Sequence, residues 1–151
     1  MKNLLNMVVS DAIAASQLYV SVFDATLGEV FEFPDRPKSN EVNVSIGQFH
    51  LRLVDENIEF DCLSPKKDEV DSIWLSLQVD DAKCVLKKAK THGMEIVTEM
   101  QEHLGQKFFE VKDPFAYTWV ISQTIREVSY EEKMAFYNDY HSGLDLKKEK
   151  E

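Results

Sequence analysis

The chain has 151 residues, of which 44% are apolar, enough to bury a hydrophobic core in one domain or in two small fused modules. Its 27 acidic residues against 17 basic ones give a formal net charge of -10, which disfavours nucleic acid and anionic membrane surfaces as partners. Neutral or cationic small molecules fit this overall charge better.

The first 60 or so residues predict a strand, a helix and three more strands. Residues 4–9 form the expected first strand, with an apolar run too short for a secretory signal or a membrane-spanning helix. Ser10 and Asp11 can cap a helix that runs to about Thr26, and Gly28 is its expected stop. The three strands that follow are predicted at residues 29–33, 41–46 and 48–54, with a turn at Gly47.

A polar stretch at residues 55–71 is the expected link to a second module of the same order, at about residues 70–125. Its elements are predicted as a strand at 73–79, a helix from Ala82 to His92, and strands at 94–98, 107–111 and 117–123. Asp80 and Asp81 cap this helix, and Gly93 ends it. The repeat is one of order and spacing, so two unrelated α+β halves remain an alternative.

The sequence of residues 126–151 predicts a C-terminal helix with a charged tail. Ser129 and Glu132 have the spacing of a capping box, and we expect the aromatic side chains after them to dock on the body of the protein. The charged residues 147–151 are expected to fray. The two cysteines, Cys62 and Cys84, form no Cys-x-x-Cys pair, so we expect free thiols and a cytoplasmic location.

Three short motifs stand out along the chain: Asp11 with Ala14-Ala15, Tyr19 and Phe23; Asp80-Asp81 with Ala89 and Gly93; and Asp113-Pro114-Phe115 with Trp119. Together they resemble the motifs of the vicinal-oxygen-chelate superfamily of glyoxalases, bleomycin-resistance proteins and dioxygenases. The tail at Glu127-Val128-Ser129 is similar to the PhnB-like branch. Ala116 replaces the glycine that the turn after Asp113 usually has.

The resemblance implies an α+β fold in which two βαβββ modules form curled mixed sheets around a cavity, followed by a C-terminal helix. It also implies a homodimer. Because strand side chains alternate between two faces, the apolar positions of each strand identify the remaining ones as cavity-facing. Cavity-facing residues expected to bind a ligand are Asn6, His50, Arg52, Trp74, Ser76, Gln78, Thr118 and Val120.

Metal-bearing relatives carry one ligand on each of four strands. By the resemblance, these positions fall near Leu4, Arg52, Trp74 and Val120, and none of these side chains suits a divalent cation. A shifted alignment recovers only His50 and Asn6, fewer than the three ligands of a catalytic site. We therefore expect neither a metal nor another cofactor.

Three of these residues have both a functional and a structural interpretation. Arg52 can hold a carboxylate or phosphate, or it can pair with Glu41 or Glu110. Trp74 can stack on a flat ligand or fill the cavity, and His50 can act as a general base or make a structural hydrogen bond.

The sequence thus predicts a metal-free small-molecule-binding protein whose ligand it does not identify. The alternative is an enzyme of the superfamily, a lyase, isomerase or dioxygenase, whose metal site is non-standard or misaligned. No nucleophile elbow, phosphate loop or dinucleotide-binding motif is present.

Overall fold

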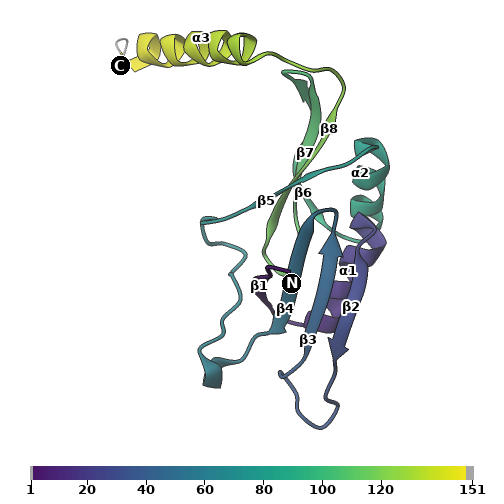
Figure 1. Cartoon of the computed structure of the whole chain (residues 1–151). Coiled ribbons are helices and arrows are strands. Elements are labelled where there is room, and N and C mark those ends of the chain that lie inside the picture. Colours follow the sequence, from purple (N-terminus) through teal and green to yellow (C-terminus); the bar gives the residue numbers. More distant parts are fainter. Residues whose placement is uncertain (1, 149–151) are drawn as a thin grey trace.

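The computed structural model describes residues 2–148, and their side chains as far as Gly143. It contains two four-stranded sheets, each with one helix, and a long C-terminal helix (Figure 1). The first module comprises β1 (Leu5–Val9), α1 (Ala12–Phe23), β2 (Thr26–Phe31), β3 (Glu41–Ile46) and β4 (Phe49–Asp55). The second comprises β5 (Leu75–Gln78), α2 (Ala82–Thr91), β6 (Glu95–His103), β7 (Gln106–Lys112) and β8 (Thr118–Thr124), and α3 (Tyr130–Lys148) follows.

The two sheets have the same topology. Their strand orders are β1-β4-β3-β2 and β5-β8-β7-β6, and in each sheet the first and last strands of the module pair in parallel. The remaining pairs are antiparallel. The predicted α+β fold of two βαβββ modules is therefore confirmed.

The repeat extends to the way each helix begins. Asp11 caps α1 by accepting a hydrogen bond from the Ala14 amide, and Asp81 caps α2 in the same way at Cys84. The first amide of each helix donates to the last strand of its module: that of Ala12 to Asp55 at 2.7 Å, and that of Ala82 to Gln123 at 3.0 Å. Each helix is thus fixed to its own sheet at its N-terminus.

The prediction that the first helix runs to Thr26 and stops at Gly28 is wrong. The helix ends at Phe23, because Asp24 adopts a left-handed conformation (φ 54°) and its amide donates to the Tyr19 carbonyl. Gly28 lies within β2, where a Cβ atom would stand 3.2 Å from the Asn43 carbonyl oxygen. This glycine allows two strands to approach closely, and it does not cap a helix.

Two strand boundaries in the second module also differ from the prediction. β6 continues beyond the predicted end at residue 98 to His103, and the chain then turns at Leu104 and Gly105. β5 begins only at Leu75, so Ile73, which was predicted to start the strand, lies before it and is 55% exposed.

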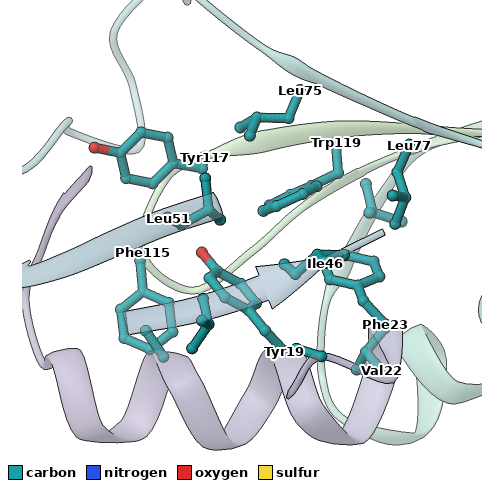
Figure 2. Packing of buried hydrophobic residues seen from close by; sticks show 14 of the residues in the cluster. Tyr19, Val22, Phe23, Ile46, Leu51, Leu75, Leu77, Phe115, Tyr117 and Trp119 are labelled. Atoms are coloured by element: carbon teal, nitrogen blue, oxygen red, sulfur yellow. The ribbon is translucent and has the colours of Figure 1, made fainter. Parts of the chain in front are cut away.

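The core of the protein is shared by both modules. α1 packs on its own sheet, and its Tyr19 and Phe23 rings lie 5.2 and 4.6 Å from the ring of Trp119 in β8 (Figure 2). Leu51 of β4 and Leu77 of β5 join the same buried cluster. Each sheet therefore turns one face toward this core and leaves its opposite face, the open face, outside it.

α3 extends away from the two sheets (Figure 1). Ser129 caps it as predicted, accepting from the Glu132 amide at 3.1 Å, but its aromatic side chains do not dock. Tyr137 and Tyr140 are 48% and 56% exposed, and the Phe136 ring lies 4.3 Å from the ring of His103, at the end of β6. The predicted docking is therefore wrong for the described side chains; residues 149–151 of the charged tail lie outside the described range. Between residues 2 and 148, no helix is long and apolar enough to cross a membrane.

Candidate functional site

The open face of the first sheet presents a row of polar side chains around Arg52. Leu51 and Leu53 on either side of it are fully buried, so Arg52 points to the opposite face, as the alternation predicted. In the strand register, Arg52 lies between Asn6 of β1 and Asn43 of β3. A guanidinium between two amides is a set of hydrogen-bond donors suited to an oxyanion.

Arg52 is half-buried, yet it has no ion-pair partner among the residues that the structure describes. Glu41 and Glu110, the partners considered from the sequence, do not pair with it. Glu110 belongs to the other sheet, where it accepts a hydrogen bond from Thr98 at 3.4 Å. The guanidinium is thus available to an external anion.

His50 lies one row from Arg52 on the same face. Its Nδ1 is 3.0 Å from the hydroxyl oxygen of Ser45, directly opposite on β3, so the structural hydrogen bond considered for His50 is present. A groove of about 570 Å³ runs between this end of β4 and the chain before β1, lined by residues that include Leu4 and His50. His50 is therefore positioned as a hydrogen-bonding group beside the groove.

Ser76, Gln78 and Val120 lie on the open face of the second sheet. Ser76 stands opposite Val120 in the register, and Gln78 hydrogen-bonds the hydroxyl of Thr124. Ser76 and Gln78 also line a groove of about 680 Å³ that reaches Phe49 at the turn of the first module.

The other two predicted residues, Trp74 and Thr118, have different surroundings. Trp74 precedes β5 and is 60% exposed, so it does not fill a cavity in the chain. Thr118 lies on the expected face, but it is only 3% exposed and its hydroxyl donates to Asp71 at 2.7 Å.

The predicted ligand-binding residues therefore form two groups in the chain. Asn6, His50 and Arg52 lie on one open face, and Ser76, Gln78 and Val120 lie on the other. Both faces point away from the core that the sheets share. Alternation within strands predicted the faces, but the relative placement of the two sheets depends on how α1 packs and was not visible in the sequence.

The residues at the positions of the family's metal ligands do not fit a divalent cation. Leu4, Trp74 and Val120 offer no donor atom, and Arg52 repels a cation. Within residues 2–148, no three His, Cys, Asp or Glu side chains are grouped so that they could hold a metal ion.

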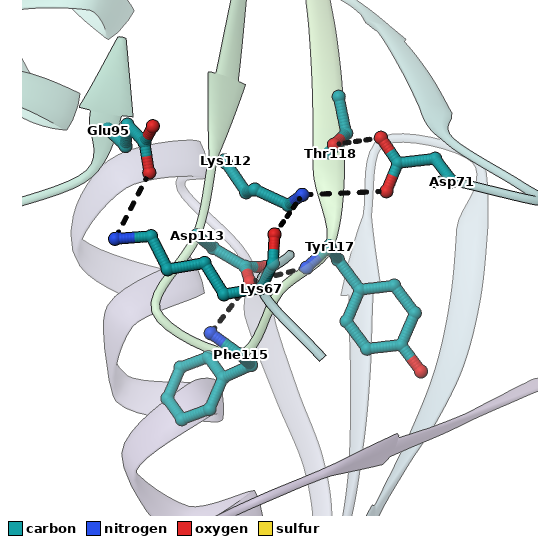
Figure 3. A network of polar contacts seen from close by, with 8 residues as sticks. All are labelled: Lys67, Asp71, Glu95, Lys112, Asp113, Phe115, Tyr117 and Thr118. Atoms are coloured by element: carbon teal, nitrogen blue, oxygen red, sulfur yellow. Dashed lines mark hydrogen bonds and ion pairs between the residues drawn. The ribbon is translucent and has the colours of Figure 1, made fainter. Parts of the chain in front are cut away.

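The sequence did not predict a buried polar cluster around Asp113 (Figure 3). The Asp113 carboxylate accepts hydrogen bonds from the Tyr19 hydroxyl at 2.6 Å and the Trp119 indole at 2.9 Å. It also accepts from the backbone amides of Phe115 at 2.9 Å and Tyr117 at 3.0 Å. Burial raises the pKa of Asp113, against the effect of these donors, and raises the pKa of Tyr19 well above its usual value.

This cluster joins the modules, because Tyr19 belongs to α1 and Asp113 precedes β8. Tyr117 adds a second link, its hydroxyl donating to the Val8 carbonyl at 3.0 Å. The Asp-Pro turn and Tyr19 were both visible as sequence motifs, but no local pattern predicted that Tyr19 and Asp113 are in contact. The cluster lies inside the shared core and holds the modules together; it does not face a ligand.

The protein therefore belongs to the class built from two βαβββ modules of identical topology. Its two modules share one core and have polar open faces. A model of the Glyoxalase/Bleomycin resistance protein/Dioxygenase superfamily matches residues 3–121. The chain belongs to this superfamily.

The chain is also similar to several individual proteins. The uncharacterized protein Mb0911c of Mycobacterium bovis is 29% identical over 143 residues, which cover 91% of this chain and 93% of that protein. The structure of hypothetical protein SA1046 from S. aureus superposes with a TM-score of 0.63 at 19% identity, covering 82% of this chain and 93% of the other. The fosfomycin resistance protein FosX from Listeria monocytogenes gives 0.63 at 11% identity, covering 87% and 96%. At these identities the two structures show the fold alone.

Proposed function

We propose that the protein binds a small molecule through a carboxylate or phosphate-type group on the open face of the first module, without a metal. The observation that carries the proposal is the half-buried, unpaired guanidinium of Arg52 among the described residues. A guanidinium removed from bulk water needs an anionic partner, and its planar fork matches a carboxylate or phosphate with two hydrogen bonds.

The neighbours of Arg52 support an oxyanion better than a cation. Asn6 and Asn43 flank it across the sheet and can donate through their side-chain amides. No carboxylate is directly opposite it in the strand register. The net charge of -10 belongs to the whole chain, whereas short-range hydrogen bonds decide which group binds here.

We further propose that the protein is a cytoplasmic member of the PhnB-like branch and forms a homodimer. The support for a dimer is the family resemblance together with the exposed aromatic face of α3, where Tyr137 and Tyr140 are 48% and 56% exposed and lie beside Phe136 of the same helix. Light scattering on the full chain tests this, since a monomeric mass across the accessible concentration range would contradict it.

The alternative is a metal-dependent enzyme. FosX structures have been determined with Mn(II), so a fold of this kind accommodates a metal in another protein. In this chain the corresponding side chains do not fit a divalent cation. Metal analysis of the purified protein decides the matter, because stoichiometric zinc, nickel, manganese or iron would overturn the metal-free proposal.

A thermal-shift screen of small carboxylates and phosphates tests the proposed ligand class, because a ligand raises the melting temperature by mass action. We expect Arg52→Gln to weaken each anionic ligand found by about tenfold or more, given the usual strength of hydrogen bonds to charged groups. Arg36→Gln is the matched control, since Arg36 lies in the loop between β2 and β3 against Phe33. Equal loss in both variants, or ligands that ignore Arg52, would refute the proposal.

A further inference from the structure

The linker between the modules, residues 56–74, crosses one end of the open face of the second sheet (Figure 3). At this end Glu95, Lys112 and Thr118 form a single row across β6, β7 and β8. The linker contacts all three. Lys67 pairs with Glu95 at 3.4 Å, and its carbonyl oxygen accepts from the Lys112 ammonium at 3.1 Å.

Asp71 is the linker residue that engages the two donors of this row. One of its oxygens accepts a hydrogen bond from the Thr118 hydroxyl at 2.7 Å, and the other lies 3.8 Å from the Lys112 nitrogen (Figure 3). The Lys112 side chain is only 13% exposed. An ammonium held in such a place requires an anion, and in this structure the chain itself supplies it.

The linker is held to the sheet by polar contacts and contributes little apolar burial there. Val70 is 95% exposed and Ile73 55%, and a cavity of about 170 Å³ lies between this part of the linker and Tyr117. Asp71 is itself partly exposed, with 32% of its side-chain surface accessible. Because this part of the linker buries little apolar surface, moving Asp71 away costs little as long as another anion takes its place beside Lys112.

We propose that Lys112 and Thr118 form a second oxyanion-binding site, in the other module from Arg52, and that the Asp71 carboxylate occupies it as an internal competitor. A carboxylate or phosphate group on a ligand takes the place of Asp71, accepting from the Thr118 hydroxyl and pairing with the Lys112 ammonium. When it binds, the linker releases this end of the open face. The site therefore couples anion binding to movement of the linker.

Titration of ¹⁵N-labelled full-length protein with inorganic phosphate, followed by NMR, tests this site. We expect Asp71→Asn to bind phosphate at least about fivefold more tightly than the wild type, because an internal anion no longer competes. The shifts should appear at the amides of Lys112 and Thr118. Adding Lys112→Met to Asp71→Asn should abolish them. Changes in the NMR signals of the Asn6 and Arg52 amides would instead report phosphate binding on the first module. The titration therefore tests this site separately from the Arg52 site of the proposed function, on which it does not depend.

Glu102→Gln is the matched control. Glu102 is the carboxylate of another pair on the same sheet, 3.8 Å from Lys107, so this variant removes one negative charge without freeing Lys112. An equal gain in Glu102→Gln and Asp71→Asn, or no gain in Asp71→Asn, would overturn the proposal. Asp71→Ala provides a second version of the test that leaves no side-chain oxygen to compete.

Discussion

Asp113 shows how one residue can join two modules. Its first oxygen accepts from two backbone amides of the turn, and its second accepts from Tyr19 in α1 and Trp119 in β8. The same turn places Ala116 in a left-handed conformation (φ 69°), the position where the family has glycine. The turn therefore keeps its shape without the glycine, and the side chain of Asp113 holds it in place.

Replacing Asp113 by asparagine should destabilise the fold by about 2–3 kcal/mol, the usual cost of leaving a buried polar group without its partner. If the amide oxygen stays on the backbone donors, the new NH₂ group faces the Trp119 indole, which is itself only a donor. Urea unfolding of both proteins measures the change. Asp24→Asn is the control, because Asp24 is 79% exposed, and equal effects in the two variants would contradict the role of the cluster.

The buried phenols predict a loss of stability at alkaline pH. Burial and the Asp113 charge raise the pKa of Tyr19, and likewise that of Tyr117. Unfolded tyrosines ionise near pH ~10, so above that pH the unfolded chain binds fewer protons than the folded chain. Stability is fully present below this pH, and it falls as pH rises toward the folded-state pKa values, by about 1.4 kcal/mol per pH unit for each phenol.

Urea unfolding at several alkaline pH values measures that slope. Tyr19→Phe should reduce it, whereas Tyr130→Phe should leave it unchanged, because Tyr130 is 71% exposed. A wild-type stability that stays level through this range would contradict the buried, protonated state of the two phenols.

At the scale of the elements, α1 and α3 differ in how much they contribute to the fold. α1 lies in the shared core, whereas the aromatic contact that α3 makes with the sheets is at their edge, between Phe136 and His103 at the end of β6. Ala135→Pro should disrupt α3 and reduce the helical circular dichroism, yet leave the melting temperature of the two sheets nearly unchanged. Ala15→Pro, at a fully buried position of α1, should prevent folding. A large drop in melting temperature for Ala135→Pro would show that α3 supports the body.

The same contrast explains which elements could be predicted. β3 was predicted with its observed bounds, and the faces of β4 and β8 were correct, because strand alternation is a local property. The end of α1 was not predicted correctly, because Gly28 was read as the stop of the helix. Gly28 instead allows β2 to approach Asn43 closely, and no local pattern reveals this contact. The aromatic residues of α3 predicted docking, but among the described side chains Tyr137 and Tyr140 stay about half exposed.

At the scale of the whole molecule, the sequence predicted two repeated modules and the residues of their open faces. It could not predict how the modules meet, because the contacts that fix them join residues far apart, such as Tyr19 and Asp113, 94 positions away. For this reason the predicted ligand-binding residues lie on two separate open faces of the chain. The contact of Asp71 with Thr118 is equally long-range, at 47 positions, and could not be foreseen.

A crystal structure of the purified protein with the tightest anion from the screen, with anomalous data for metals, tests the central claim most directly. The account predicts an oxyanion within hydrogen-bonding distance of the Arg52 guanidinium, and no metal peak on either open face. A divalent cation held by side chains of these sheets, or an anion bound away from Arg52, would contradict it.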